Sequence, residues 1–141
     1  MAGIAGLESP VGVRRQNGCF VCGPDNPQGL HIRFRTAGEG AVEADWTPPP
    51  AVEGYVGYVH GGVVAAVLDE AMSKAVAAVN VTALTAHLEV RYRHPARTGE
   101  RYRIEGHVSR RDKRRIFVRA RLLDLQNRAR AEATACFVCP R

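Results

Sequence analysis

Two kinds of hydrophobic pattern divide the chain. From about Gly61 to Val79, apolar residues occur on every side of a helical repeat, which predicts one long helix that is buried all round. Elsewhere apolar and polar residues alternate, as they do in half-buried strands. The alternating segments are 30–36 and 41–46 before the helix, and 84–92, 102–108, 116–122 and 128–138 after it. The sequence therefore predicts two strands, one helix and four further strands.

The connecting segments indicate how the strands pair. "AGEG" between the first two alternating segments predicts a hairpin. "PARTG", "SRRDKR" and "LQNR" separate the last four, so an antiparallel sheet is expected. The segment 47–60 contains three consecutive prolines, which exclude both a helix and a central strand. We expect it to be an extended loop leading into the helix.

A helix that is apolar all round needs a cover on every side, whereas a flat sheet covers only one. A curved antiparallel sheet wrapped around the helix, with a second copy of the chain closing the remaining side, would bury it. This α+β architecture is the hotdog fold.

Length and composition are those of one globular domain. The chain has 141 residues, of which 45% are hydrophobic and 24% charged. Residues 1–18 lack periodicity and are expected to be a flexible N-terminal segment, with a single domain at 19–141. No basic start followed by an apolar run is visible, and the longest apolar stretch, 63–68, is far too short to span a membrane. We therefore expect a cytoplasmic protein without membrane association.

Three segments carry a resemblance to a known family. "VHGGVVAAVLDEA" (59–71) resembles the helix signature of hotdog-fold acyl-CoA thioesterases of the 4-hydroxybenzoyl-CoA and phenylacetate-pathway type, in which an acidic residue follows the histidine by nine positions. "LTAHLEVRYRHPARTGE" (84–100) resembles the next strand of that family, and "CFVCGPDNPQGLHIRF" (19–34) the N-terminal segment of one bacterial subgroup. The resemblance implies thioester hydrolysis by a homodimer with shared active sites, with a dimer of dimers left open.

Asp69 is the first candidate catalytic residue. Its helical neighbours are uncharged, so the carboxylate is expected to be half buried and without a partner in its own helix. Keeping a carboxylate there is costly, which favours a catalytic role as general base or as nucleophile. Glu70, by contrast, precedes Lys74 by four residues, and we interpret these two as a surface ion pair. The family resemblance implies that Thr85 positions the attacking water.

The start of the helix is the second half of the expected site. Its free backbone N–H groups and partial positive charge could polarise a thioester carbonyl, and Gly61 and Gly62 would let the ligand approach the backbone. His60 either contacts the thioester or is a structural loop residue. Seven residues separate Gly62 from Asp69, about 10 Å along the axis, so the acid must come from the antiparallel helix of a second subunit.

The net charge of +6 favours an anionic partner, and coenzyme A carries phosphates. The family resemblance implies that two turns flank the nucleotide, and four basic residues in these turns are expected to bind its phosphates, because arginine matches phosphate oxygens. We also expect substrate contacts from Gly61 and from two residues of the segment after the helix, and an acyl pocket lined by loop 47–59 with Tyr55 and Tyr58. The phosphate-binding candidates are Arg97, Arg110, Arg111 and Lys113, and the further substrate contacts are Tyr92 and His94.

The four cysteines form two C-x2-C pairs, Cys19 with Cys22 and Cys136 with Cys139. Together they could form a four-thiolate zinc site. Cys136 and Cys139 fall in a predicted strand, however, where they would point to opposite faces. We therefore expect free thiols and neither a metal nor a cofactor. Two alternative functions remain open: an acyl-CoA-binding protein without activity, and a zinc protein that binds nucleic acid, although no nucleic-acid partner is expected.

Overall fold

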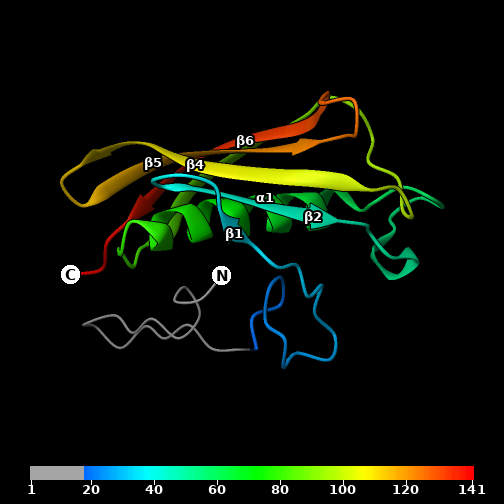
Figure 1. The fold of residues 1–141 in the computed structure, drawn as a ribbon, viewed down its shortest axis with the longest axis horizontal. Coiled ribbons are helices and arrows are strands. Elements are labelled where there is room, and N and C mark those ends of the chain that lie inside the picture. Colours follow the sequence, from blue (N-terminus) through cyan, green and yellow to red (C-terminus); the bar gives the residue numbers. More distant parts are fainter. Residues whose placement is uncertain (1–17) are drawn as a thin grey trace.

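The computed structural model describes residues 18–141, so the expectation of a flexible segment at 1–18 falls almost entirely outside the described residues. The elements are, in order, β1 (Arg35–Thr36), β2 (Ala41–Trp46), the 3-10 helix η1 (Pro50–Val52), α1 (Gly61–Ala78), β3 (Leu84–Tyr92), β4 (Tyr102–Asp112), β5 (Arg115–Leu123) and β6 (Ala129–Val138). The strands form one antiparallel sheet in the order β1-β2-β4-β5-β6-β3, lying over one side of α1 (Figure 1). The predicted α+β hotdog arrangement is confirmed.

Small residues allow α1 to approach the sheet closely. A Cβ added at Gly106 of β4 would lie 2.6 Å from the backbone oxygen of Ala71 in α1, which is too close for any side chain. Leu68, Ala71 and Met72 of α1 are fully buried. The side chains that β4 and β5 were predicted to bury, such as Ile104 and Ile116, are fully buried as well. Within residues 18–141, no helix is both long and apolar enough to cross a membrane.

The segment 18–34 lies on the side of α1 away from the sheet (Figure 1). Val21, Ile32 and Phe34 belong to the same buried core as the helix. The strand predicted at 30–36 is therefore wrong in extent, because only Arg35–Thr36 pairs with β2. Residues 30–34 keep the alternation of buried and exposed side chains without joining the sheet. The alternation of residues 30–34 therefore reflects burial beneath the helix and not pairing with another strand.

β3 also differs from its prediction. The apolar face expected from Leu84 to Tyr92 is not buried: Leu84 and Tyr92 are each 52% exposed, and the strand has no fully buried residue. β3 is an edge strand that pairs only with β6. Its register with β6 shifts between Thr85 and His87, so the side chains before and after this irregularity do not share one face.

Candidate active site

The carboxylate of Asp69 is half buried in the middle of α1, as expected. Thr85, at the start of β3, donates a hydrogen bond from Oγ1 to Oδ1 of Asp69 at 2.7 Å. The structure thus brings together two of the predicted residues, 16 positions apart in sequence. This bond holds one carboxylate oxygen in a defined position, which suits a group that takes a proton from water.

The N-terminus of α1 is capped by His60. Its Nδ1 accepts a hydrogen bond from the Gly62 N–H at 2.9 Å, so a neutral imidazole here carries its proton on Nε2. A Cβ on Gly62 would lie 3.1 Å from this ring, so any other residue here would require the imidazole to shift. The amide predicted to polarise a carbonyl is therefore engaged by the imidazole, and a ligand would have to displace His60 to reach it.

A pocket of about 290 Å³ opens beside the start of α1. It brings together three residues predicted to contact substrate: Gly61, Tyr92 and His94. The Tyr92 hydroxyl donates to the Gly61 carbonyl oxygen at 2.6 Å, and burial raises the pKa of this phenol, which keeps it a donor. Six of the other residues that line the pocket are apolar and two are arginines: Val59, Val64, Pro95, Ala96, Leu122 and Ala131, with Arg93 and Arg130.

The loop 47–59 contributes less to this pocket than predicted. Val59 lines it, but Tyr55 and Tyr58 do not. Tyr55 is 88% exposed. Tyr58 instead lies under Arg97, whose guanidinium carbon is 4.9 Å from the ring centre.

Arg130 is a pocket residue that the sequence analysis missed. Its guanidinium donates to the Pro95 carbonyl at 2.6 Å and lies 3.5 Å from the Asp124 carboxylate. Its own carbonyl accepts hydrogen bonds from the Arg93 and His94 N–H groups. Arg130 therefore holds the loop that forms one wall of the pocket. The alternation in β6 assigns this arginine to the outer face, so the pattern carried no signal of the role.

Asp124, the partner of Arg130, is 8% exposed. Its carboxylate accepts hydrogen bonds from the Arg128 and Gln126 N–H groups. These hydrogen bonds hold the pKa of Asp124 below its ordinary value of 3.8, and the bond from the Arg128 N–H has the largest effect.

The predicted phosphate-binding residues do not meet within one chain. Arg97 follows β3, whereas Arg110, Arg111 and Lys113 lie at the β4–β5 turn. β4 has 11 residues and is about 35 Å long, so the two groups are at opposite ends of the sheet (Figure 1). Arg110 stacks on Phe117 with its guanidinium carbon 3.9 Å from the ring centre. Only a second chain could place both groups around one ligand.

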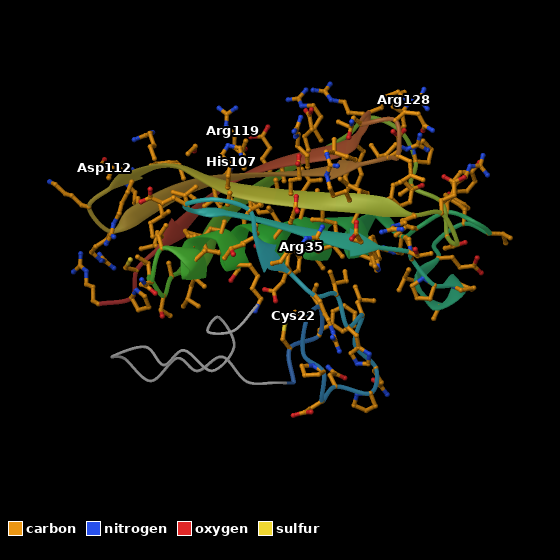
Figure 2. The ribbon with its side chains drawn as sticks, in the orientation of Figure 1. Cys22, Arg35, His107, Asp112, Arg119 and Arg128 are labelled. Atoms are coloured by element: carbon orange, nitrogen blue, oxygen red, sulfur yellow. The ribbon has the colours of Figure 1, made fainter. Side chains whose placement is uncertain are left out.

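The two cysteine pairs lie in different places. Cys19 and Cys22 form a group with Glu70 of α1, in the segment beneath the helix where Figure 2 labels Cys22. Cys139 instead follows β6, and its N–H donates to the Arg114 carbonyl. The structure does not bring the four thiols of the alternative zinc site together: among residues 18–141, the only such group of potential metal ligands contains neither Cys136 nor Cys139.

Glu70 and Lys74 are also not the surface ion pair that their spacing suggested. Glu70 is 9% exposed and Lys74 is 6% exposed. Both thiols donate to the same oxygen of Glu70, from Cys19 at 2.9 Å and from Cys22 at 3.0 Å. The cysteines interact as a pair: their mutual hydrogen bond lowers the pKa of Cys19 and raises that of Cys22. The four-residue spacing does place Glu70 and Lys74 on one face of α1, but it does not show that segment 18–34 covers that face.

Comparisons with known proteins place the chain in a family. The profile of the Thioesterase superfamily matches residues 56–131, more than half of the chain. A comparison with curated protein sequences finds no significant match. The chain belongs to the Thioesterase superfamily.

Solved structures show the same fold. The crystal structure of a thioesterase superfamily protein matches with a TM-score of 0.83 and 27% identity, over 90% of this chain and 62% of that one. A phenylacetic acid degradation-related protein from Ralstonia eutropha matches with a TM-score of 0.68 and 28% identity, covering 77% and 86%. A Streptococcus mutans protein bound to acetyl CoA matches with a TM-score of 0.73 and 16% identity, covering 77% and 88%. The chain thus spans less than two thirds of the first of these proteins.

Proposed function

We propose that the protein hydrolyses acyl-CoA thioesters, with Asp69 as general base. The observation that carries the proposal is the hydrogen bond from Thr85 to a half-buried Asp69, on a helix whose glycine N-terminus adjoins a mostly apolar pocket. Asp69 would take a proton from water, whose oxygen attacks the thioester carbonyl carbon. The carbon–sulfur bond then breaks, and the thiolate of coenzyme A leaves and is protonated. The products are the free acid and coenzyme A.

The helix N-terminus would stabilise the negative charge that develops on the carbonyl oxygen. Substrate would displace His60 from the Gly62 N–H, and this amide would then donate to the carbonyl. Until the ligand binds, the His60 imidazole would keep the Gly62 N–H oriented.

The acyl group would occupy the pocket beside Gly61 and Tyr92. Coenzyme A is the proposed carrier because the chain is basic and because the similarly folded protein of S. mutans binds acetyl CoA. Arg97 of one chain, with Arg110, Arg111 and Lys113 of another, would surround the phosphates. These residues lie at opposite ends of the sheet, so one ligand can reach both groups only across a two-fold dimer.

The separation of Gly62 and Asp69 along α1 also supports a homodimer with composite sites, in which each active site combines residues of two chains. Gly62 and Asp69 lie about 10 Å apart along α1, too far to act on one carbonyl from the same chain. An antiparallel partner helix would place the partner's acid beside this chain's glycines. A dimer of dimers is compatible with the same pairing.

The test is release of coenzyme A from short, long and aromatic acyl-CoAs by wild type and by Asp69→Asn. Asp69→Asn should lose about 100-fold or more in kcat, as expected when a general base is removed. Asp25→Asn, which changes an exposed carboxylate far from Asp69 in sequence, is the matched control and should keep wild-type rates. Binding of acyl-CoA without turnover by the wild type would instead indicate a binding protein.

A single turnover in ¹⁸O-labelled water separates a general base from a nucleophile. With Asp69 as general base, the label enters only the released acid. If Asp69 forms a mixed anhydride that water opens at the aspartyl carbon, the label of that single turnover enters Asp69 and the released acid carries none.

A further inference from the structure

Cys19, Cys22 and Glu70 form a compact group that the proposed hydrolysis does not use. Their nearest ligand atoms all lie within 4.8 Å of one another. Glu70 is buried, and the two thiols are half buried. The cysteines are 51 and 48 residues from Glu70 in sequence, so the group joins the segment 18–34 to the middle of α1.

The donor set is one that zinc prefers. Two thiolates separated by two residues are the usual half of a structural zinc site, and a carboxylate oxygen is a common further ligand. Around a tetrahedral zinc ion, with Zn–S of about 2.3 Å and Zn–O of about 2.0 Å, sulfur and oxygen would be about 3.5 Å apart. The observed distances from the sulfurs to Glu70 Oε2 are 2.9 and 3.0 Å. A shift of about half an ångström would therefore admit the ion.

The surrounding charge also fits a divalent cation. Two thiolates and one carboxylate carry three negative charges, and a divalent ion leaves one. Lys74 is buried one helical turn after Glu70, and its charge acts on Cys22. The positive charge of the Lys74 side chain would balance the remaining negative charge of the loaded site, which lowers the cost of burying it.

We propose that Cys19, Cys22 and Glu70 bind one thiophilic divalent metal ion, zinc in the first instance, with a water molecule as fourth ligand. The ion clamps the segment 18–34 to the face of α1 opposite the sheet. Its contribution would be to stability, because a cross-link between residues so far apart in sequence restricts the unfolded chain. The turn is already shaped for this role, since the Gly23 N–H donates to the Cys19 carbonyl at 2.8 Å.

The second cysteine pair supplies a matched control. Protein purified without chelators should contain about one zinc per chain. Cys136→Ser with Cys139→Ser should keep that zinc, and Cys19→Ser with Cys22→Ser should lose it. Glu70→Gln should weaken zinc binding by at least about tenfold in a competition with a chromogenic chelator.

Cobalt reconstitution keeps the test decisive even if a cysteine variant fails to fold. After removal of zinc, Co²⁺ bound to the full-length wild type should produce a thiolate-to-metal charge-transfer band and the intense visible bands of tetrahedral cobalt. Chelation should lower the Tm of the wild type and of the Cys136/Cys139 variant.

Three outcomes would overturn the proposal. They are full-length wild-type protein that takes up neither zinc nor cobalt, zinc that persists after both Cys19 and Cys22 are replaced, and a Cys19–Cys22 disulfide in protein purified without reductant that zinc does not prevent. Each is independent of thioester hydrolysis, so failure of the metal site leaves the proposed activity untouched.

Discussion

Thr85 on the edge strand β3 donates a 2.7 Å hydrogen bond to Asp69 in the middle of α1. The bond joins the exposed margin of the sheet to the only long helix of the described chain, and it fixes the orientation of a half-buried carboxylate. An edge strand with so little burial has no packing reason to anchor a carboxylate there. This pair is therefore where a change in side chain should affect chemistry more than folding.

Replacing Thr85 with valine should lower kcat by about 10- to 100-fold and leave KM nearly unchanged, because a hydrogen bond to a charged group contributes about 1.5–3 kcal/mol. Thr85→Ser retains the hydroxyl and should recover most of the rate. Steady-state kinetics on the preferred acyl-CoA would check both. Equal rates in wild type and Thr85→Val would show that the hydroxyl does not position Asp69.

His60→Ala should destabilise the protein by about 1 kcal/mol, the usual effect of removing an N-cap. The Gly62 N–H loses its acceptor, and the first turn of α1 becomes less stable. His60→Asn supplies a short acceptor and should recover most of the loss. Urea unfolding measures both changes. An unchanged midpoint in His60→Ala would mean that water replaces the imidazole without cost.

Gly106→Ala should destabilise the protein by about 1–3 kcal/mol, the typical effect of overpacking a core. The added methyl group would lie 2.6 Å from the Ala71 carbonyl oxygen, so α1 would have to move away from β4. Gly18→Ala is the control, because a Cβ there meets nothing within 4 Å. Thermal unfolding should show a lower Tm for Gly106→Ala alone; equal values would mean that the helix shifts freely.

The stability contributed by Asp124 should depend on pH. Its pKa in the folded protein lies below the ordinary value of 3.8, chiefly because the Arg128 N–H donates to the carboxylate. A lowered pKa stabilises the folded state above the ordinary pKa, and the contribution is lost as the pH falls through the folded value. Asp124→Asn should therefore have a lower Tm than wild type at pH 7, and the difference should shrink below pH 3.8. Asp25→Asn should show no such trend.

Much of the fold could be predicted because alternation and turns are local properties. The helix bounds differ from the prediction by one residue, and Ile104 and Ile116 are buried as expected. The predictions were wrong where a segment is buried without pairing in the sheet, and where a strand pairs in the sheet without being buried. Ile32 and Phe34 alternate because they lie beneath α1, and Leu84 alternates on an edge strand that its own chain leaves exposed.

The candidate site was predicted in part for a similar reason. Asp69 stood out because a carboxylate interrupts an apolar helix, and Thr85 through a family resemblance. Glu70 was misplaced, since its spacing from Lys74 is also that of a surface pair, and only the path of the segment 18–34 shows that both are buried. Long-range contacts of this kind leave no periodic signal in the sequence.

Composite sites predict that two inactive variants complement each other. Asp69→Asn removes the acid, and Gly62→Pro removes the backbone donor. Proline is compatible with the first turn of a helix, provided that the His60 ring, 3.1 Å from a Cβ at this position, moves aside. Half of the dimers in an equal, re-equilibrated mixture would contain one chain of each kind. Each such dimer has one site with both groups intact, so the mixture should recover about a quarter of wild-type activity.

The control mixes Asp69→Asn with the double variant carrying both substitutions, which cannot form an intact site and should stay inactive. Size-exclusion chromatography with light scattering should show a dimer or a dimer of dimers throughout. A mixture of the two single variants that exchanges subunits but recovers no activity would place both groups in the same chain. The reacting carbonyl would then have to reach Gly62 and Asp69 along one helix, which their separation of about 10 Å opposes.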